Sequence, residues 1–168
     1  MAHTQSLSLM PRTVTSVPLV ELHQSLPSQI QAISPFVDQL MRFILAFRNA
    51  NGSEIEIETA LREALANAVI HGNGENSHKR VYVVCRCYMD GEVLITVRDQ
   101  GQGFDNTALP DPTVPENRLF THGRGIYLMK TLMDEVCFEK GGAVVRMRKK
   151  SNRGLAAQRR QNDMQTRK

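Results

Sequence analysis

The stretch RVYVVCRCYMDGEVLITVRD, residues 80–99, decides how the rest of the chain can fold. Two runs rich in β-branched and aromatic residues are separated by Asp90-Gly91. Such runs on both sides of an Asp-Gly pair are a strong signal for a β-hairpin with a tight turn. The sequence therefore predicts two antiparallel strands here, and the flanking segments have to extend this pair and cover it.

Upstream of the hairpin, the pattern first predicts a strand and then a helix. Residues 13–22 alternate as a strand does, and Pro18 indicates an edge position. Ser34 and Pro35 suit the N-cap and the first position of a helix that should end near Gly52. The apolar residues of this helix recur at spacings of three and four, which is typical of an amphipathic helix. They are Val37, Leu40, Met41, Ile44 and Leu45.

A second helix is expected to begin at Ser53, which stands three residues before Glu56 as in a capping box. It should end at His71-Gly72, with Gly72 or Gly74 available for a left-handed C-cap. Its predicted buried stripe consists of Ile57, Leu61, Ala64, Leu65 and Ala68.

Downstream of the hairpin, a loop rich in Pro, Asp and Asn runs from residue 101 to about residue 124. Residues 125–134 are predicted to form a third helix, and two further strands flank Gly141-Gly142. The order β-α-α-β-β-loop-α-β-β predicts an α/β (α+β) two-layer sandwich, with the helices packed on one face of a single sheet.

Composition and length narrow the classes of protein further. The 168 residues are enough for one globular domain. No apolar run approaches the roughly 20 residues that cross a bilayer, and the N-terminus lacks the pattern of a secretory signal. The three cysteines lack partners at metal-binding spacing, so we expect them to be reduced and to act as small apolar residues. These features favour a cytoplasmic location.

The charge is unevenly distributed along the chain. From Arg146 to Lys168 there are nine Lys/Arg and one acid, whereas the residues before this segment carry 12 Lys/Arg and 16 Asp/Glu. We expect a flexible segment at 1–12, one domain at 13–150 and a basic, disordered tail at 151–168. Such a tail could contact nucleic acid or an acidic partner, but a solvated chain end is more common. Direct binding to nucleic acid is not expected, because no helix-turn-helix candidate is present.

Glu63 and Asn67, in EALANAVIHGN, are four residues apart on the second predicted helix. Their side chains therefore share one helix face, turned away from the apolar stripe. A carboxylate and an amide oxygen are ligands that a hard cation such as Mg²⁺ accepts. Glu63 could also orient a metal-bound water or accept a proton from an attacking hydroxyl. The alternative is an exposed hydrogen-bonded pair without a catalytic role.

Asp99 closes the second strand of the hairpin and is followed by Gly101 and Gly103. Its carboxylate could accept hydrogen bonds from a ligand amine, and the glycines would allow close approach. The alternative is an aspartate that caps its own backbone turn. The spacing does not match the dinucleotide fingerprint, and the chain contains no Walker A pattern.

A second glycine pair, Gly123 and Gly125, stands immediately before the third predicted helix. Backbone N–H groups at a helix N-terminus can bind an anion, and Arg124 adds a positive charge. The segment 107–122 is placed to fold over such a site. The alternative is a plain helix entry.

Taken together, these motifs resemble a known superfamily. EALANAVIHGN resembles the N box, DQGQGF the first glycine box and GRGIYLMKTLMDEV the second glycine box of the GHKL ATP-binding proteins. Within them, NAVIHG and PENRLFTHGRGIYLM most resemble the anti-sigma factor serine/threonine kinases of bacterial partner-switching systems. The resemblance covers roughly residues 13–149. It implies a Bergerat-type fold with one mixed, largely antiparallel sheet covered by about three helices.

The resemblance also implies ATP and Mg²⁺ as cofactors, with a role for each motif. Asn67 would bind Mg²⁺, and Glu63 would be the catalytic general base. Asp99 would bind the exocyclic amine of adenine, while Gly101 and Gly103 would leave space for the ring and the sugar. The segment 107–122 would be the ATP lid. Further nucleotide contacts would come from Thr121, Gly123, Arg124 and Gly125.

The function implied by the resemblance is that of an ATP-dependent anti-sigma factor. It would sequester a sigma factor in one state and phosphorylate a Ser/Thr of a STAS-type anti-anti-sigma antagonist in the other. The alternative is an ATP- or partner-binding module of the same fold without efficient phosphotransfer. A detached histidine kinase domain is disfavoured, because nothing upstream predicts a phosphoacceptor histidine on a dimerising hairpin. A homodimer is possible, and no membrane partner is expected.

Overall fold

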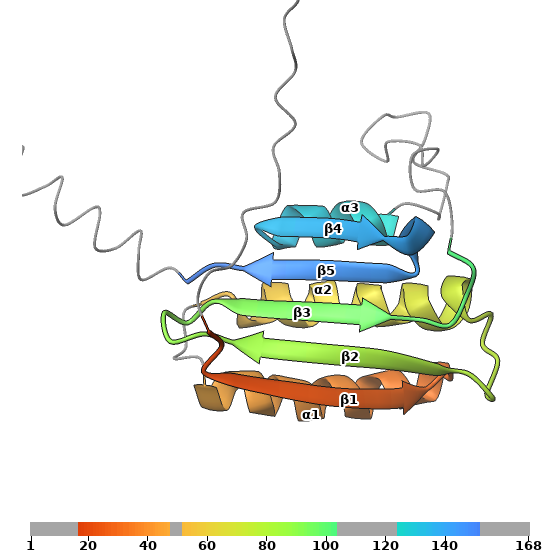
Figure 1. Cartoon of the computed structure of the whole chain (residues 1–168), viewed down its shortest axis with the longest axis horizontal. Helices are drawn as coiled ribbons and strands as arrows, with labels where there is room; N and C mark the ends of the chain where they lie inside the picture. Colours follow the sequence, from red (N-terminus) through yellow and green to blue (C-terminus); the bar gives the residue numbers. More distant parts are fainter. Residues whose placement is uncertain (1–16, 48–51, 104–123, 152–168) are drawn as a thin grey trace, which may run out of the picture.

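The computed structural model describes residues 17–47, 52–103 and 124–151. Figure 1 shows the elements, which follow the predicted order. Their bounds are β1 (Val20–Pro27), α1 (Ile33–Phe47), α2 (Glu54–Ala66), β2 (Arg80–Cys87), β3 (Val93–Arg98), α3 (Arg124–Leu132), β4 (Glu135–Glu139) and β5 (Val144–Lys149). A 3-10 turn at Ile30–Ala32 precedes α1, and a π-helical segment at Asn67–Gly72 continues α2.

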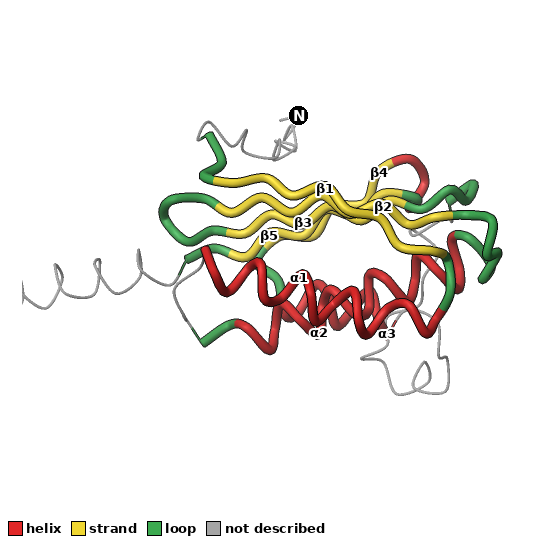
Figure 2. The backbone as a smooth tube through the Cα atoms, turned by 90° about the horizontal axis from the view of Figure 1, so that it is seen from below, coloured by secondary structure: helices red, strands yellow, loops and turns green. Residues whose placement is uncertain are grey.

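The five strands form one sheet in the order β1-β2-β3-β5-β4. The hairpin of β2 and β3 lies at its centre, as predicted, and β1 is an edge strand. All three helices lie on one face of the sheet, which Figure 2 shows edge-on. The predicted two-layer fold is confirmed. Every pairing between described strands is antiparallel, so the sheet is not mixed in this part of the chain.

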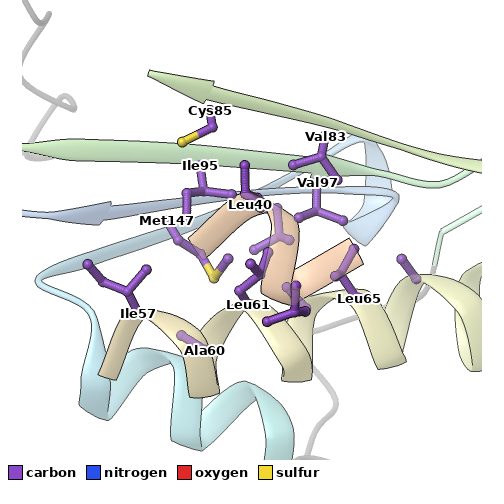
Figure 3. Packing of buried hydrophobic residues seen from close by; sticks show 14 of the residues in the cluster. Leu40, Ile57, Ala60, Leu61, Leu65, Val83, Cys85, Ile95, Val97 and Met147 are labelled. Carbon is purple, nitrogen blue, oxygen red and sulfur yellow. The ribbon is translucent and has the colours of Figure 1, made fainter. Parts of the chain in front are cut away.

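The core lies between the sheet and the helices (Figure 3). Alternate residues of the hairpin point into it, including Val83, Cys85, Ile95 and Val97, each at most 1% exposed. Burying one such aliphatic side chain contributes about 1.5–3 kcal/mol. Hydrogen bonding to Cys87 and burial raise the pKa of the Cys85 thiol, so these two cysteines act as small apolar residues. The third, at position 137, is exposed instead.

The first strand lies later in the chain than predicted, at Val20–Pro27 instead of 13–22. Its eight residues pair one to one with β2, from Val20 opposite Cys87 to Pro27 opposite Arg80. This register buries Leu26 against the helices. The alternation of apolar and polar residues in the sequence extends beyond the paired segment. Pairing with β2 decides which of these residues form the strand.

Helix α1 also differs at its start. The 3-10 turn runs straight into it, and the N–H of Ile33 donates to the carbonyl of Ile30. Ser34 and Pro35 therefore lie within the first turn, not at the N-cap and first position, and Ser34 Oγ accepts a hydrogen bond from Arg62 on α2. Four of the five predicted stripe residues are buried, whereas Leu45 is 46% exposed. The predicted end near Gly52 falls in a segment, 48–51, that lies outside the described residues.

The expectation that no apolar run reaches membrane-spanning length needs a correction at the same helix. Residues Ile30–Phe47 form an 18-residue helical stretch with a mean hydropathy of 1.2, enough by length and composition to cross a bilayer. The stretch contains Asp38 and Arg42, and its buried side packs into the core. Asp38 also pairs with Arg62 of α2 at 3.4 Å. These contacts favour a core helix.

In α2 the predicted stripe is confirmed, because all five residues are buried. The predicted capping box is wrong: the Ser53 side chain makes no capping hydrogen bond, although its carbonyl accepts from the N–H of Ile57. Glu56 instead forms an ion pair with Lys149 at the end of β5. At the other end Gly74 has a φ of +64°, so it is the predicted left-handed glycine.

Candidate functional site

Three of the predicted site residues meet where α2 and α3 pack together. Glu63 and Asn67 lie on one face of α2, and both are half-buried. Gly125 lies in the first turn of α3. A Cβ atom at Gly125 would stand 2.6 Å from Glu63 Oε2 and 3.4 Å from Asn67 Nδ2. The backbone of Gly125, the described member of the second glycine pair, therefore lies directly against the carboxylate and close to the amide, which an exposed pair without a role would not require.

Asn67 marks the point where α2 changes from α-helical to π-helical. Its N–H is shared between the carbonyls of Ala64 and Glu63. Farther on, the N–H of Asn73 donates to the carbonyl of Ala68 at 2.9 Å, a bond that spans five residues. Single π turns within helices are uncommon and occur frequently at functional sites. The wider turn begins at the predicted metal ligand.

Asp99 lies at the end of β3 and is 8% exposed. Its Oδ1 accepts a hydrogen bond from the N–H of Gly101 at 2.7 Å, so the carboxylate does cap its own turn. Its own N–H donates to the carbonyl of Ala143 at 3.1 Å. Burial raises the pKa of this carboxyl, while the hydrogen bond from Gly101 lowers it. The two interpretations of Asp99 are compatible, because the capped carboxylate also faces a pocket.

This pocket lies between α2, α3 and the sheet, and it contains two of the predicted site residues. Asn67 and Asp99 are the polar side chains on its mostly apolar wall, and the cavity is small, about 20 Å³ in volume. The lining consists of Ala64, Asn67, Ala68, Val97, Asp99, Met129, Phe138, Gly142 and Val145.

Gly101 and Gly103 serve to let backbone segments touch. A Cβ at Gly101 would lie 2.7 Å from the carbonyl carbon of Gly72 and 2.9 Å from Asp99 Oδ1. Gly103 has a φ of +81°, and a Cβ there would lie 2.8 Å from the carbonyl oxygen of Lys140. The first glycine box thus lies in close contact with Gly72, after α2, and with the turn that joins β4 to β5.

Other predicted positions are less informative. Thr121, Gly123 and the segment 107–122 lie outside the described residues. Arg124 is the exposed first residue of α3. His71 is exposed.

Residues that sequence reasoning missed belong to the same region. Gly72 lies against the Asp99 carboxylate, where a Cβ would stand 2.8 Å from Oδ1. Asn73 is 3% exposed and bonds to Arg80 of β2 and to Gln100 in the turn after β3. Phe138 and Gly142 line the pocket from the β4–β5 hairpin. The sequence contained a signal only for Gly72 and Asn73, because they end the motif EALANAVIHGN. Phe138 and Gly142 reach the pocket only because the strand order places β5 next to β3 and β4 next to β5.

A more open groove on the opposite face of the sheet contains none of the predicted site residues. Most of its lining residues have polar or charged side chains, with Arg98 stacked over the ring of Tyr82 at 5.3 Å and Arg146 paired with Glu139 at 3.3 Å. Its lining consists of His23, Tyr82, Val84, Thr96, Arg98, Glu139, Lys140, Val144 and Arg146. The two predicted site residues that line a pocket, Asn67 and Asp99, therefore lie on the helix side of the sheet.

Comparison with known families agrees with this geometry. Residues 25–149 match the histidine kinase-like ATPase domain. The chain belongs to this family. It is 31% identical over 138 residues to the serine-protein kinase RsbW of Staphylococcus epidermidis, which covers 75% of this chain and 84% of that protein.

Two anti-sigma F factors are also similar. That of Bacillus subtilis (strain 168) is 32% identical over 108 residues, or 60% of this chain and 72% of the relative. That of Priestia megaterium is 37% identical over 93 residues, or 50% of this chain and 58% of the relative. The chain thus spans less than two thirds of the length of the Priestia megaterium factor. Within the histidine kinase-like ATPases, it belongs with the anti-sigma kinases.

The residues of this histidine kinase-like ATPase domain fit a nucleotide that brings its own metal. Among the described residues, no group of three or more His, Cys, Asp or Glu could hold a metal ion. Mg²⁺ commonly takes one or two protein ligands and completes its shell with water and phosphates. The amide oxygen of Asn67, with the Glu63 carboxylate one turn away, supplies a donor set of that size.

Proposed function

We propose that this protein is an ATP-dependent anti-sigma factor and serine/threonine kinase. In one state it sequesters a sigma factor, and in the other it phosphorylates a Ser/Thr of a STAS-type anti-anti-sigma antagonist. The observation that carries the proposal is the close contact of Gly125 with Glu63 and Asn67. Asn67 also lines a pocket together with Asp99. The names of the relatives, anti-sigma F factor and serine-protein kinase, support the same assignment.

Each residue has a task in this proposal. Asp99 accepts a hydrogen bond from the exocyclic amine of adenine inside the apolar pocket. Asn67 holds Mg²⁺, and the N–H groups of the first turn of α3 face the phosphates. Glu63 Oε2 accepts the proton of the attacking hydroxyl. Bound Mg-ATP supplies the phosphoryl group and the charge neutralisation that this transfer requires.

The first experiment identifies the proteins that bind this chain. The tagged chain is used for pull-downs from its native cell with ADP or ATP present, and bound proteins are identified by mass spectrometry. A sigma factor and a small STAS protein are expected, with the nucleotide deciding which is retained. Sigma binding without phosphate transfer to the STAS protein would favour the alternative of a binding module.

The largest catalytic effect is expected for Glu63→Gln. The amide keeps the shape of the side chain but does not accept a proton, so transfer from radiolabelled ATP to the antagonist should fall by about 10²- to 10⁴-fold. Affinity for ADP should stay within about threefold. Glu58→Gln, on the same helix but paired with Arg62 at 2.9 Å, is the matched control and should transfer phosphate normally. Normal transfer by Glu63→Gln would show that Glu63 is not the base.

A further inference from the structure

Three consecutive backbone amides at the end of β3 are held by three different parts of the molecule. The N–H of Asp99 donates to the carbonyl of Ala143, just before β5, at 3.1 Å. The N–H of Gln100 donates to Asn73 Oδ1 at 2.8 Å. The N–H of Gly101 donates to Asp99 Oδ1 at 2.7 Å. Of these acceptors, only the Asn73 side chain comes from the helix layer.

Asn73, which follows the π-helical segment after α2, bonds to the first residue of β2 and to the turn that follows β3. Besides accepting from Gln100, it donates from Nδ2 to the carbonyl of Arg80, the first residue of β2, at 3.1 Å. Its own N–H closes the π turn on the carbonyl of Ala68. The residue is 3% exposed, so water does not replace these bonds without cost. The buried side-chain amide of Asn73 therefore fixes the position of the helix end relative to Asp99.

The position of this helix end matters to the Asp99 carboxylate. Gly72, the residue before Asn73, lies directly against that carboxylate, and Gly101 lies against the Gly72 carbonyl. A shift of the helix end would move Gly72 and open space beside Oδ2. We propose that Asn73 is a positioning residue that sets the base selectivity of the nucleotide pocket. It does so by holding the end of α2 and the Asp99–Gly101 turn in fixed register.

This inference rests on the proposed function, in which Asp99 recognises an amine on the base. A fixed carboxylate accepts a hydrogen bond from the amine of adenine and repels the carbonyl oxygen that guanine has at the corresponding position. A carboxylate that can shift lets water enter between the two groups and loses this distinction. Asn73 touches neither metal nor phosphate in this scheme. Its loss should therefore change selectivity more than general nucleotide binding.

The test compares Asn73→Ala with Gln100→Ala in the full chain. Binding of Mg-ADP and Mg-GDP is measured by titration calorimetry. Asn73→Ala should weaken ADP binding by about tenfold and GDP binding by less than about threefold, so the ADP/GDP preference should fall. Gln100→Ala removes a neighbouring bond, from the N–H of Arg80 to Gln100 Oε1 at 2.7 Å, but keeps the backbone N–H that Asn73 binds. It should keep the preference.

Hydrogen exchange gives a second measure that needs no nucleotide. The amides of Gln100 and Gly101 should exchange at least about tenfold faster in Asn73→Ala, while those of Val93 to Val97 should stay protected. If Asn73→Ala does not fold, Asn73→Asp replaces it, since that variant keeps an acceptor for Gln100 and replaces the donor to Arg80 with a carboxylate oxygen. It should give an intermediate ADP/GDP preference.

Two results would overturn the inference. Equal weakening of ADP and GDP would show that Asn73 supports the fold without setting selectivity. Unchanged exchange at Gln100 would show that Asn73 does not hold the turn. If the unaltered chain binds neither nucleotide, the proposed function fails, and the exchange measurement still decides whether Asn73 holds the turn.

Discussion

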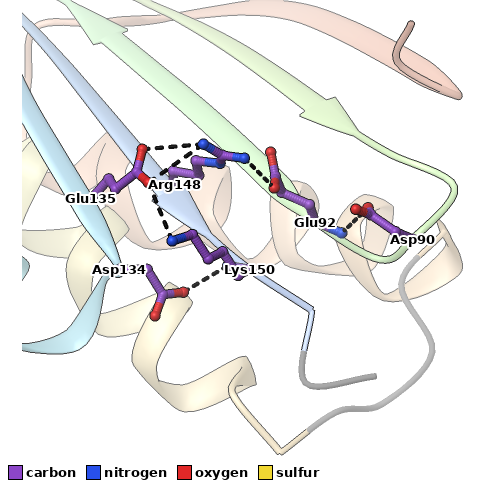
Figure 4. A network of polar contacts seen from close by, with 6 residues as sticks. All are labelled: Asp90, Glu92, Asp134, Glu135, Arg148 and Lys150. Carbon is purple, nitrogen blue, oxygen red and sulfur yellow. Dashed lines mark hydrogen bonds and ion pairs between the residues drawn. The ribbon is translucent and has the colours of Figure 1, made fainter. Parts of the chain in front are cut away.

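The two ends of the central hairpin are held by different means. At the end where β3 finishes, Gly72, Gly101 and Gly103 allow backbone segments to touch one another. At the end where β3 begins, charged side chains form a network that joins strands (Figure 4). The first arrangement leaves Asn67 and Asp99 on the wall of a pocket, whereas in the second the charged groups pair with one another.

The network at the start of β3 is centred on Arg148 of β5. Its Nη2 donates to Glu92 Oε2 at 2.7 Å and its Nη1 to Glu135 Oε2 at 3.2 Å. The side chains of Glu92 and Arg148 are 8% and 17% exposed, and their hydrogen bond raises the pKa of the guanidinium. Close by, the N–H of Lys150 donates to Asp134 at 2.7 Å. This end has many charged side chains but none of the predicted site residues, so charge density alone would not have located the candidate site.

The largest change in stability is expected at this network. Arg148→Met should lower the free energy of unfolding by about 3–5 kcal/mol, because it leaves the Glu92 carboxylate buried without its cation. Affinity for ADP should be unchanged at temperatures where the variant is folded. Denaturant unfolding and calorimetry give the two quantities. The double variant Glu92→Gln/Arg148→Met should recover part of the loss, and a fall in ADP affinity would show that the two ends are coupled.

A smaller loss of stability, combined with a loss of binding, is expected for Gly101→Ala. Its Cβ would meet the backbone of Gly72, so the end of α2 must shift, at about 1–3 kcal/mol. ADP binding should weaken at least about tenfold as Asp99 moves. Gly74→Ala is the matched control, because Gly74 also ends the helix but a Cβ there meets nothing within 4 Å. With a φ of +64° it should cost about 1 kcal/mol and leave binding intact.

The smallest change in stability is expected for Asp99→Asn, with the opposite sign. Burial raises the pKa of Asp99 in the folded state, so its ionised form weakens folding as the pH rises above the ordinary value of 3.8. The variant should be slightly more stable than the unaltered chain at pH 7, and this gain should vanish at low pH. Thermal unfolding from pH 3 to 8 checks the sign. The preference for ADP over GDP should fall, and an unchanged preference would remove Asp99 from base recognition.

Local patterns in the sequence were sufficient for most of the fold. The Asp90-Gly91 turn, the stripe of α2 and the β4–β5 hairpin all depend on neighbours within a few residues, and all three are confirmed. The errors occurred where a distant partner decided the outcome. Pairing with the eight residues of β2 fixed the bounds of β1. Glu56, which a capping box would have used, forms an ion pair with Lys149 instead.

The site shows the same division. Spacing along the chain placed Glu63 and Asn67 on one helix face and put Asp99 at a strand end, because helical and strand periods are local properties. The second glycine motif contacts this helix face only because α3 packs on α2, which places Gly125 against Glu63. The bonds of Asn73 to Arg80 and Gln100 likewise join residues that only the folded chain brings within reach. The candidate site residues could thus be named from the sequence, whereas their distances were set by long-range packing, which no local pattern encodes.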